Sequence, residues 1–463
     1  MPRRLRSRYT LGEPWADGRG ILLNGFSGAV DIVPREAIDF VAEHREAELD
    51  PNDPLHATLL ERGYYVHSRE VEDAYARHVA RRAKARARAS GQPKYMFGLT
   101  LKCNLACHYC WQVVEHGSRR QRTPLMSEAM VDAAFELIDR DLERRRRQDA
   151  FVSLFGGEPL IDHHDFRNLV NAVGQRTAER GKHLHFTTNG RDLAAYRDEI
   201  HRFGPSIQVT VDGAEVSPAQ VVLTRAGQRL DGVFETLAEI MAEGRAATFL
   251  RFLASPATVP QFVALADRIF ATPCFDDGFT LAVAPIQNKA ERVDPAIPPK
   301  FRVLELLMEA LRDRSYSSRI AFVDWRSLRL FDHLRAGEEA LPSPSFFHCE
   351  ANLELMCFGH DGRLYACYEA IGDPALSVGR YWPEVEIDEA HLAQYRDRSA
   401  FAMPECSECA LSPICGGGCE VRGIKHNGTY MRPYCDALHA EARLVLRNWQ
   451  EVSELLIGGT HAP

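Results

Sequence analysis

The strongest constraint on this chain is the placement of its cysteines. The sequence holds 12 cysteines, and all but Cys274 fall into two groups, one at positions 103, 107 and 110 and the other between positions 349 and 435. The N-terminus is basic, but no apolar segment follows it, so we find no export signal and expect the thiols to stay reduced. Grouped thiols in a reducing compartment usually hold a metal. The sequence therefore predicts metal-binding regions and not a disulfide framework.

Length and charge narrow the class of protein further. With 463 residues, of which 45% are hydrophobic and 26% charged, the chain is an ordinary globular sequence with room for two or three domains. The net charge of −8 gives no basic field of the kind that marks nucleic-acid binders. No apolar run has the length that a membrane-spanning helix needs. We therefore expect a cytoplasmic protein whose partners include neither nucleic acid nor membrane.

The chain divides into regions of different pattern. The first predicts a small α+β domain, with a hairpin over 21–33 and a basic helix over 78–94. A solvated face explains the basic run most simply, and contact with an acidic peptide is the alternative. The predicted boundaries are 1–92 for this domain, 93–340 for an α/β barrel, 341–440 for a Cys-rich domain, and 441–463 for a C-terminal helix and tail.

The second region alternates short apolar runs with helical patterns, which indicates βα units around a parallel sheet. Ser127 is the expected N-cap of a helix over 128–146, and a last amphipathic helix is expected over 436–456. Sites in such sheets gather at the carboxyl ends of the strands, so we expect the functional site there. The predicted strands are 96–101, 150–155, 183–187, 206–211, 247–254 and 279–284.

The first cysteine group, Cys103-x3-Cys107-x2-Cys110, comes directly after a predicted strand. Three thiolates on a short loop can hold three irons of a [4Fe–4S] cube, which leaves the fourth iron free to bind a cofactor or substrate. A structural zinc site is the alternative, but it needs a fourth ligand that the nearby sequence does not supply. The spacing therefore favours an iron–sulfur site with an open position.

This cysteine spacing, together with the residues at the ends of the later predicted strands, closely resembles the motifs of the radical S-adenosylmethionine superfamily. The resemblance implies a partial (β/α)6 TIM-like barrel that binds S-adenosylmethionine at its mouth. It also implies reductive cleavage of that cofactor to methionine and a 5′-deoxyadenosyl radical, which removes a hydrogen atom from the substrate. The positions expected to contact the cofactor are Tyr109, Gly156, Gly157, Glu158, Pro159, Thr188, Asn189, Thr210, Asp212 and Arg225.

The resemblance assigns roles to several of these residues. Tyr109 matches the aromatic residue that the family places against the adenine, and Glu158 matches the acceptor for the ammonium group of the methionine moiety. The Thr188-Asn189 pair ends a strand at a position that the family uses around the sugar. Thr210 replaces the usual Ser of the hydroxyl–x–Asp–Gly pattern, and Arg225 resembles an arginine that binds the cofactor carboxylate.

The second cysteine set is similar to the SPASM domain, a C-terminal extension of many peptide-modifying radical enzymes. The resemblance implies two more [4Fe–4S] clusters, so three in all. One would take Cys349, Cys357, Cys367 and Cys419, and the other Cys406, Cys409, Cys415 and Cys435. Zinc ribbons are the alternative for CxxC spacings. The position of Cys357 varies among relatives, and without it the first auxiliary cluster would have an open iron.

The preferred hypothesis is a maturase that installs a thioether, a carbon–carbon crosslink or another oxidation on a ribosomally made precursor peptide. The first 80 or so residues loosely resemble front domains that bind a leader peptide by strand addition, and a domain that only packs on the barrel is the alternative. The other expected partner is a one-electron reductant such as flavodoxin or ferredoxin.

Two other functions remain open. Sulfatase-type maturases, which make formylglycine, resemble this chain but place an aspartate directly after the cysteine that is Cys367 here, where this chain has Tyr368 and then Glu369. Glu369 is either a catalytic base or a solvated surface carboxylate. A non-catalytic iron–sulfur electron carrier is the last alternative, and the cofactor motifs argue against it.

Overall fold

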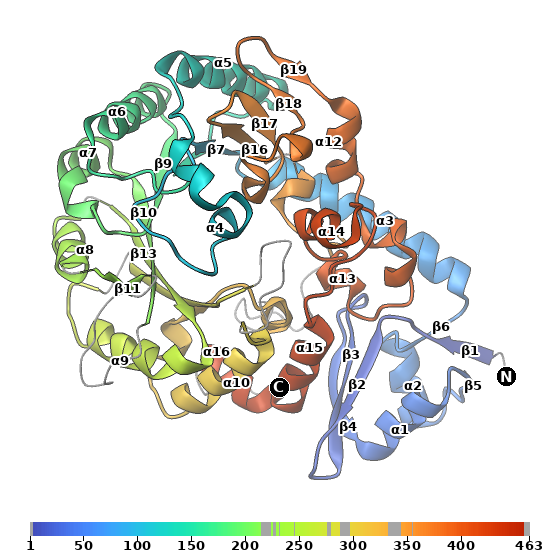
Figure 1. The fold of residues 1–463 in the computed structure, drawn as a ribbon. Helices are drawn as coiled ribbons and strands as arrows, with labels where there is room; N and C mark the ends of the chain where they lie inside the picture. The colour runs from blue at the N-terminus through green and yellow to red at the C-terminus, as the bar shows by residue number, and fades with distance from the viewer. Residues whose placement is uncertain are drawn as a thin grey trace.

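The computed structural model describes residues 3–213, 224–225, 228–230, 232–244, 246–275, 279–287, 297–331, 344–353 and 355–457. It shows an N-terminal α+β unit, a curved parallel sheet with helices around its outside, and a Cys-rich C-terminal region that lies beside the sheet (Figure 1). Within the described part of the chain, no helix is both long and apolar enough to cross a membrane.

The N-terminal unit contains two small antiparallel sheets, with strand orders β2-β3-β4 and β5-β1-β6. The predicted hairpin over 21–33 is confirmed: Asn24 ends β3, and its side chain accepts hydrogen bonds from the backbone N–H of Phe26 and Ser27 at 2.9 and 3.0 Å. The elements are β1 (Arg3–Arg6), β2 (Thr10–Pro14), β3 (Arg19–Asn24), β4 (Val30–Pro34), α1 (Arg35–Glu43), β5 (Glu46–Glu48), α2 (Pro54–Glu61), β6 (Tyr65–Val66) and α3 (Arg69–Ser90).

The basic helix predicted over 78–94 is α3, which begins at Arg69 and ends at Ser90. The prediction missed its first turns because they are acidic and not basic. Ser68 caps this end by accepting a hydrogen bond from Val71 N, and Glu70 and Glu72 lie in the first turn.

The predicted parallel sheet is confirmed, and all six predicted strands form. The barrel strands are β7 (Lys94–Gly98), β8 (Phe151–Phe155), β9 (His183–Thr188), β10 (Ser206–Asp212), β13 (Thr248–Ala254), β14 (Phe279–Pro285) and the short β15 (Ala321–Phe322). They pair in parallel and in chain order, which leaves a partial barrel. The first strand ends at Gly98 and not at residue 101 as predicted, so residues 99–102 already belong to the loop that leads to the cysteines.

Helices α5–α9 form the outer ring of the barrel (Figure 1). Ser127 caps α5 as predicted, accepting a hydrogen bond from Met130 N at 3.2 Å. The helices of this region are α4 (Trp111–His116), α5 (Glu128–Arg145), α6 (His164–Glu179), α7 (Arg197–Phe203), α8 (Val233–Ala242), α9 (Val259–Phe270) and α10 (Lys300–Leu311), and a small hairpin β11 (Thr224–Arg225) and β12 (Gln228–Arg229) follows β10.

The Cys-rich region extends the barrel sheet. Strand β16 (Met356–Gly359) pairs in parallel with β7, and β17 (Arg363–Tyr365), β18 (Gly379–Arg380) and β19 (Glu386–Ile387) continue the sheet in antiparallel fashion. Its helices are α12 (Glu389–Arg396), α13 (Ser412–Cys415), α14 (Glu420–Asn427), α15 (Leu438–Arg447) and α16 (Trp449–Ile457). The prediction of a single helix over 436–456 is wrong, because two helices form there. The helical hydrogen bonding is interrupted at Asn448, and Trp449 packs against Phe331 with 4.2 Å between the ring centroids.

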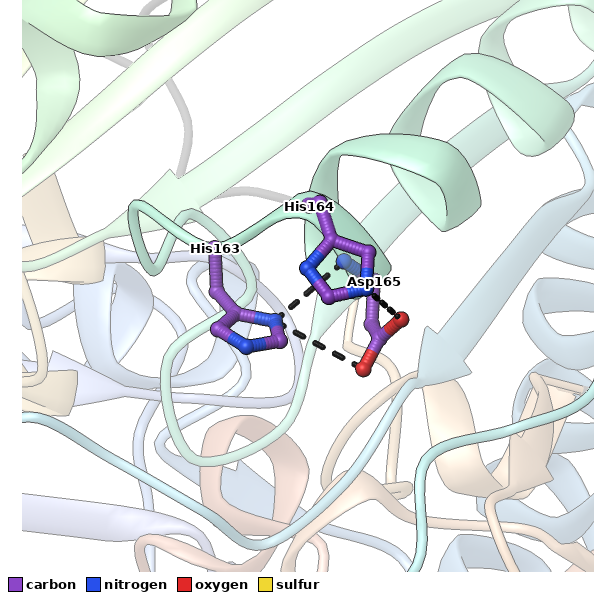
Figure 2. A group of neighbouring side chains, drawn as sticks. All are labelled: His163, His164 and Asp165. Carbon is purple, nitrogen blue, oxygen red and sulfur yellow. Dashed lines mark hydrogen bonds and ion pairs between the residues drawn. The ribbon is translucent and has the colours of Figure 1, made fainter.

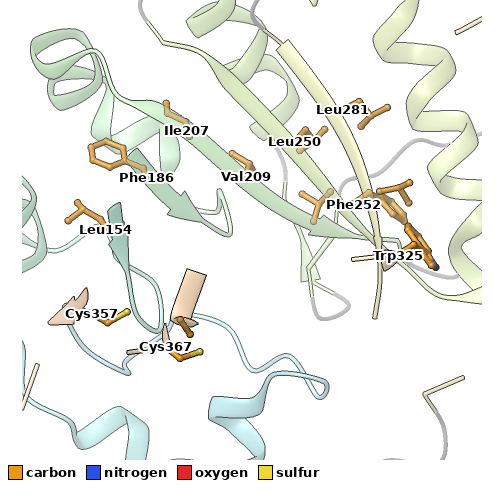
Figure 3. Packing of buried hydrophobic residues seen from close by; sticks show 14 of the residues in the cluster. Leu154, Phe186, Ile207, Val209, Leu250, Phe252, Leu281, Trp325, Cys357 and Cys367 are labelled. Carbon is orange, nitrogen blue, oxygen red and sulfur yellow. The ribbon is translucent and has the colours of Figure 1, made fainter. Parts of the chain in front are cut away.

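Short 3-10 helices complete the described elements: Gly117–Arg122, Leu193–Tyr196, Pro256–Thr258, Ser317–Arg319, Arg326–Phe331, Glu350–Leu353, Tyr368–Ala370, Pro374–Leu376, Ala400–Ala402 and Pro404–Cys406. One hydrophobic core runs through the barrel and into the Cys-rich region. It includes Leu154, Phe186 and Val209 on the barrel strands together with Cys357 and Cys367 (Figure 3). The barrel and these two cysteines thus share a core.

Candidate functional site

A cavity of about 400 Å³ lies within the curved sheet, a size that suits a small-molecule site. Its wall includes the three cysteines of the first group, and side chains from the ends of β8, β9 and β10. The predicted residues that line it are Cys103, Cys107, Tyr109, Cys110, Gly156, Gly157, Glu158, Thr188, Asn189 and Thr210. Pro159 and Asp212 are buried but lie outside this lining, and the side chain of Arg225 lies outside the described residues.

The cysteine loop is held by hydrogen bonds from several segments. Asn189 Nδ2 donates to Asn104 Oδ1 at 2.8 Å, and Asn104 Nδ2 donates to Asp192 Oδ2 at 2.9 Å. Gln121 Nε2 donates to Cys103 O at 2.8 Å, and the buried Arg120 donates to Leu105 O. These contacts attach the loop to the end of β9 and to the 3-10 helix Gly117–Arg122.

Among the described residues, no three cysteines bring their sulfur atoms within 4.8 Å of one another. Burial raises the pKa of Cys103 to about 11, so a bound metal would be needed to hold that sulfur as a thiolate.

Two glycines let the end of β8 pass close to the cysteine loop. Gly156 has a φ of +134°, and a Cβ there would lie 2.3 Å from Thr100 O. A Cβ at Gly157 would lie 1.9 Å from Lys102 O. Gly157 N and Glu158 N donate to Thr100 O and Lys102 O, each at 2.8 Å. Only glycine permits this approach, so the predicted need for Gly-Gly has a direct steric cause.

Glu158 is buried and joins the ends of β8 and β9. Its carboxylate accepts hydrogen bonds from Thr188 Oγ1 at 2.7 Å, Asn189 N at 2.7 Å and Leu160 N at 2.9 Å. A carboxylate has about four acceptor positions, so about one remains for a ligand. Burial raises the pKa of Glu158 to about 7, although the three hydrogen bonds favour the charged form.

Tyr109 and Asp212 meet across the site. The Tyr109 hydroxyl donates to Asp212 Oδ2, which links the cysteine loop to the end of β10. Asp212 also pairs through its backbone with Thr224 in β11, the strand that carries Arg225. Beside this link, Gln208 Nε2 donates to Thr210 Oγ1 at 3.3 Å. The motif residues that the sequence places at separate strand ends are thus connected in space.

Four other cysteines form what we call the inner group: Cys349, Cys357, Cys367 and Cys419. Burial raises the pKa of the Cys367 thiol well above its usual value, and the charges of Glu369, Cys419, Cys349 and Cys357 raise it further. Cys357 lies on β16 and is 0% exposed. Cys349 Sγ lies 3.6 Å from Glu420 Oε2. The structure therefore brings together the four cysteines that the resemblance assigned to one cluster.

The remaining cysteines form the outer group: Cys406, Cys409, Cys415 and Cys435. They line a separate cavity of about 270 Å³. Burial raises the pKa of Cys406 to about 12, and the neighbouring thiols add to the effect. His439 Nε2 lies 3.4 Å from Cys409 Sγ. These are the four cysteines that the resemblance assigned to the other cluster.

Glu369, the predicted base, is 4% exposed and is therefore not a surface carboxylate. Its charge acts on Cys367, Cys419 and Arg422, which places it at the inner group. The lining of the main cavity includes its neighbour Tyr368 but not Glu369 itself. A role for Glu369 in catalysis stays a prediction.

Sequence reasoning missed several residues of the site. The ion pair of Arg251 and Asp324 lines the cavity, and so do His185 and Gln287. Arg251 was detectable, because in the strand TFLRFLA it is a charged residue that interrupts a continuous apolar run, which is unusual for a buried strand. Asp324 follows the two-residue strand β15, whose sequence carries no comparable signal.

Another cluster of metal-binding side chains lies on the surface, at the start of α6. His163, His164 and Asp165 bring their ligand atoms within 4.8 Å of one another (Figure 2). All three are exposed, and His164 Nε2 already pairs with Asp165 Oδ1 at 2.8 Å. They line none of the cavities that contain the cysteines.

Comparisons with known proteins find one matching domain family and several relatives. The radical SAM superfamily domain matches residues 98–253. Pre-heme d1 synthase of Dinoroseobacter shibae is 22% identical over 74% of this chain and 85% of its own length. GTP 3′,8-cyclase of Erythrobacter litoralis is 30% identical, but over only 25% of this chain and 32% of its own length.

Solved structures share the fold. Streptococcus suis SuiB bound to precursor peptide SuiA has a TM-score of 0.53 at 17% identity, covering 93% of this chain and 98% of that one. The structure of anSMEcpe with bound AdoMet and Cp18Cys peptide has a TM-score of 0.53 at 13% identity, covering 78% and 98%. At such identities the likeness concerns the fold.

Proposed function

We propose that this chain, an enzyme with a radical S-adenosylmethionine domain over residues 98–253, oxidatively modifies a ribosomally made precursor peptide. The observation that carries the proposal is the arrangement of the thiols. Three cysteines line a cavity shared with the cofactor motifs, and two further sets of four lie in the adjoining region. In this proposal, residues 93–340 are the catalytic barrel and residues 341–440 the auxiliary-cluster domain.

The superfamily implies S-adenosylmethionine and a [4Fe–4S] cluster, and we propose Cys103, Cys107 and Cys110 as the cluster ligands. When bound, that cluster supplies the electron that splits the cofactor into methionine and a 5′-deoxyadenosyl radical. Glu158 would accept from the cofactor ammonium group with its remaining lone pair, next to Thr188 and Asn189. Tyr109, held by Asp212, would pack against the adenine.

The rest of the wall would protect a reactive radical. Leu105, Trp111, Phe155, Leu253 and Ile286 line the same cavity, and they present apolar surface to it. Such a wall keeps water from the reacting centre and leaves the substrate as the nearest source of a hydrogen atom.

We propose that the inner and outer groups each hold one auxiliary [4Fe–4S] cluster. Each group supplies four sulfur atoms, which is a complete ligand set. An oxidised product requires that the substrate radical lose an electron, and clusters beside the barrel could accept it. A flavodoxin or ferredoxin would supply the electron for the first cluster.

A peptide substrate is supported by the fold. Both solved neighbours, SuiB and anSMEcpe, hold a peptide. In this chain the helices α1, α2 and α3 follow the sheet β2-β3-β4, and among the described residues β4 pairs with β3 alone. We therefore propose that residues 1–92 bind the leader of the precursor by adding a strand to this sheet.

Formylglycine formation has less support. The residue after Cys367 that lines the cavity is Tyr368, where sulfatase-type maturases have a carboxylate, and Glu369 lies outside the lining. A simple electron carrier would need no cavity lined by cofactor motifs.

The test is production of 5′-deoxyadenosine. The anaerobically reconstituted chain, incubated with dithionite and S-adenosylmethionine, should release 5′-deoxyadenosine, and Cys110→Ala should reduce the yield to background. Cys274→Ala is the matched control and should retain the wild-type yield.

A short peptide encoded beside the gene should lose two hydrogens on co-expression if a crosslink forms. No 5′-deoxyadenosine from the wild type would refute the enzymatic proposal, and an unmodified peptide would refute the crosslink.

A further inference from the structure

The inner and outer cysteine groups are joined by a linker of three glycines, at which close contacts leave no room for side chains. Cys415 of the outer group and Cys419 of the inner group flank Gly416, Gly417 and Gly418, whose φ values are +65°, +90° and +74°. A Cβ on these glycines would lie 2.1 Å from Phe347 C, 2.0 Å from Met403 Cε and 1.9 Å from Tyr434 O, respectively. A side chain at any of these three positions would therefore collide with its neighbours.

A buried arginine organises this linker. Arg398 has a side chain that is 0% exposed, and it donates to Gly417 O at 2.8 Å, Gly418 O at 2.7 Å and Gly416 O at 3.4 Å. Its Nε donates to Tyr430 O at 2.7 Å. The guanidinium fork thus holds all three linker carbonyls, and a lysine could not match this geometry.

The same guanidinium lies close to residues of both groups. On the inner side, it donates to Gly418 O, directly before Cys419, and its Nη1 lies 3.4 Å from Glu420 Oε1, whose carboxylate partner oxygen lies 3.6 Å from Cys349 Sγ. On the outer side, the positive charge of Arg398 acts on Cys406 and favours its thiolate. Both Arg398 and Glu420 are buried, so water screens these interactions weakly.

We propose that Arg398 is a positioning residue that couples the two auxiliary clusters: it fixes the distance between their ligand sets and stabilises the added electron on either one. Reduction of a cluster adds one negative charge to a site that already holds four thiolates. A buried cation beside that site makes the reduced form more favourable, whereas the Glu420 carboxylate makes it less so. This inference rests on the proposed function, because it requires that both groups hold clusters.

The two charges predict effects of opposite sign. The experiment uses the full chain with Cys103→Ala, Cys107→Ala and Cys110→Ala, so that only auxiliary clusters give a signal, in a redox titration followed by electron paramagnetic resonance. Arg398→Met should lower the ratio of reduced to oxidised cluster at a fixed potential roughly tenfold, or about 59 mV for a one-electron couple. Glu420→Gln, which keeps the volume, should raise that ratio.

The control and the failing outcomes are distinct. Glu199→Gln alters another buried carboxylate, which lies on the barrel helix α7 and pairs with Arg167 at 3.4 Å, and it should leave the ratio unchanged. Unchanged ratios in both Arg398→Met and Glu420→Gln, at full iron content, would overturn the inference and leave the proposed function intact. Absence of auxiliary signals before either change would refute the two-cluster proposal itself. If Arg398→Met loses its iron, the direction of change in Glu420→Gln decides alone.

Discussion

The loop that carries Cys103, Cys107 and Cys110 and the inner cysteine group use the same residue type in opposite ways. The loop presents three thiols to a cavity of about 400 Å³ lined by polar strand ends. The inner group collects four thiols within the common hydrophobic core, and Cys357 and Cys367 are part of that core. Three ligands beside a cavity leave room for a cofactor, whereas four buried ligands suit electron storage. In the proposed function, this difference assigns bond cleavage to the loop and electron acceptance to the inner group.

The largest effect on activity is expected from a substitution that adds a side chain where the end of β8 contacts the loop of Cys103, Cys107 and Cys110. Gly157→Ala would place a Cβ 1.9 Å from Lys102 O, next to Cys103, so the cysteine loop must move. Displacement of reacting groups by about 1 Å can cost about 100-fold in rate, and we expect at least that loss of 5′-deoxyadenosine formation. The matched control is Gly181→Ala, which has positive φ but open space around it and should lose only stability. Near-normal turnover by Gly157→Ala would show that the loop is not fixed against β8.

The comparison between the cysteine sites is tested most directly by removing one inner thiol. Cys419→Ala should stop product formation on the peptide but keep 5′-deoxyadenosine formation within roughly tenfold of wild type, because the first cluster is separate. Iron content should fall, since one four-thiolate set is incomplete. Both products are measured in the same reaction by mass spectrometry. If 5′-deoxyadenosine disappears as completely as in Cys110→Ala, the separation of roles is wrong.

A smaller effect is expected at the link between the cysteine loop and β10. Tyr109→Phe keeps the ring but removes the hydroxyl that donates to Asp212. A hydrogen bond to a charged group contributes about 1.5 to 3 kcal/mol, so KM for S-adenosylmethionine should rise roughly tenfold or more while kcat changes less. Tyr316→Phe is the control, because that hydroxyl bonds to Asp267 at 2.6 Å and lines no part of the cavity. Equal effects of the two changes would indicate a general loss of stability.

The sequence predicted those features whose signal is local. Each barrel strand is a short apolar run, the Asn24 turn has its own side-chain hydrogen bonds, and the cysteine spacing is visible in the sequence itself. Strand β16 was missed because its partner β7 lies far away in the chain, and no periodicity reports such a pairing. The break at Asn448 was missed because the helical pattern continues through it, and only the burial of Trp449 on Phe331 explains it.

The same distinction holds for the site. Glu158 was found from its motif, but its three hydrogen bonds depend on how the ends of β8 and β9 approach each other. Arg398 has no motif at all. Its role follows from the fold, which surrounds an arginine of a polar segment with carbonyl groups of the glycine linker.

The last prediction compares two buried carboxylates, one at each site. Glu420 pairs with Arg398, whereas Glu158 accepts hydrogen bonds from two backbone N–H groups and a hydroxyl, all of them neutral. Burial raises the pKa of Glu158 from 4.5 to about 7, so between these values the folded protein keeps a proton that the unfolded chain has released. The contribution of Glu158 to the free energy of unfolding is therefore complete below pH 4.5 and decreases as the pH rises to about 7. Glu158→Gln does not titrate, so the excess of wild-type over variant melting temperature should be larger at pH 5 than at pH 8. An excess that stays constant would mean that Glu158 is charged throughout this range, and that its hydrogen bonds outweigh its burial.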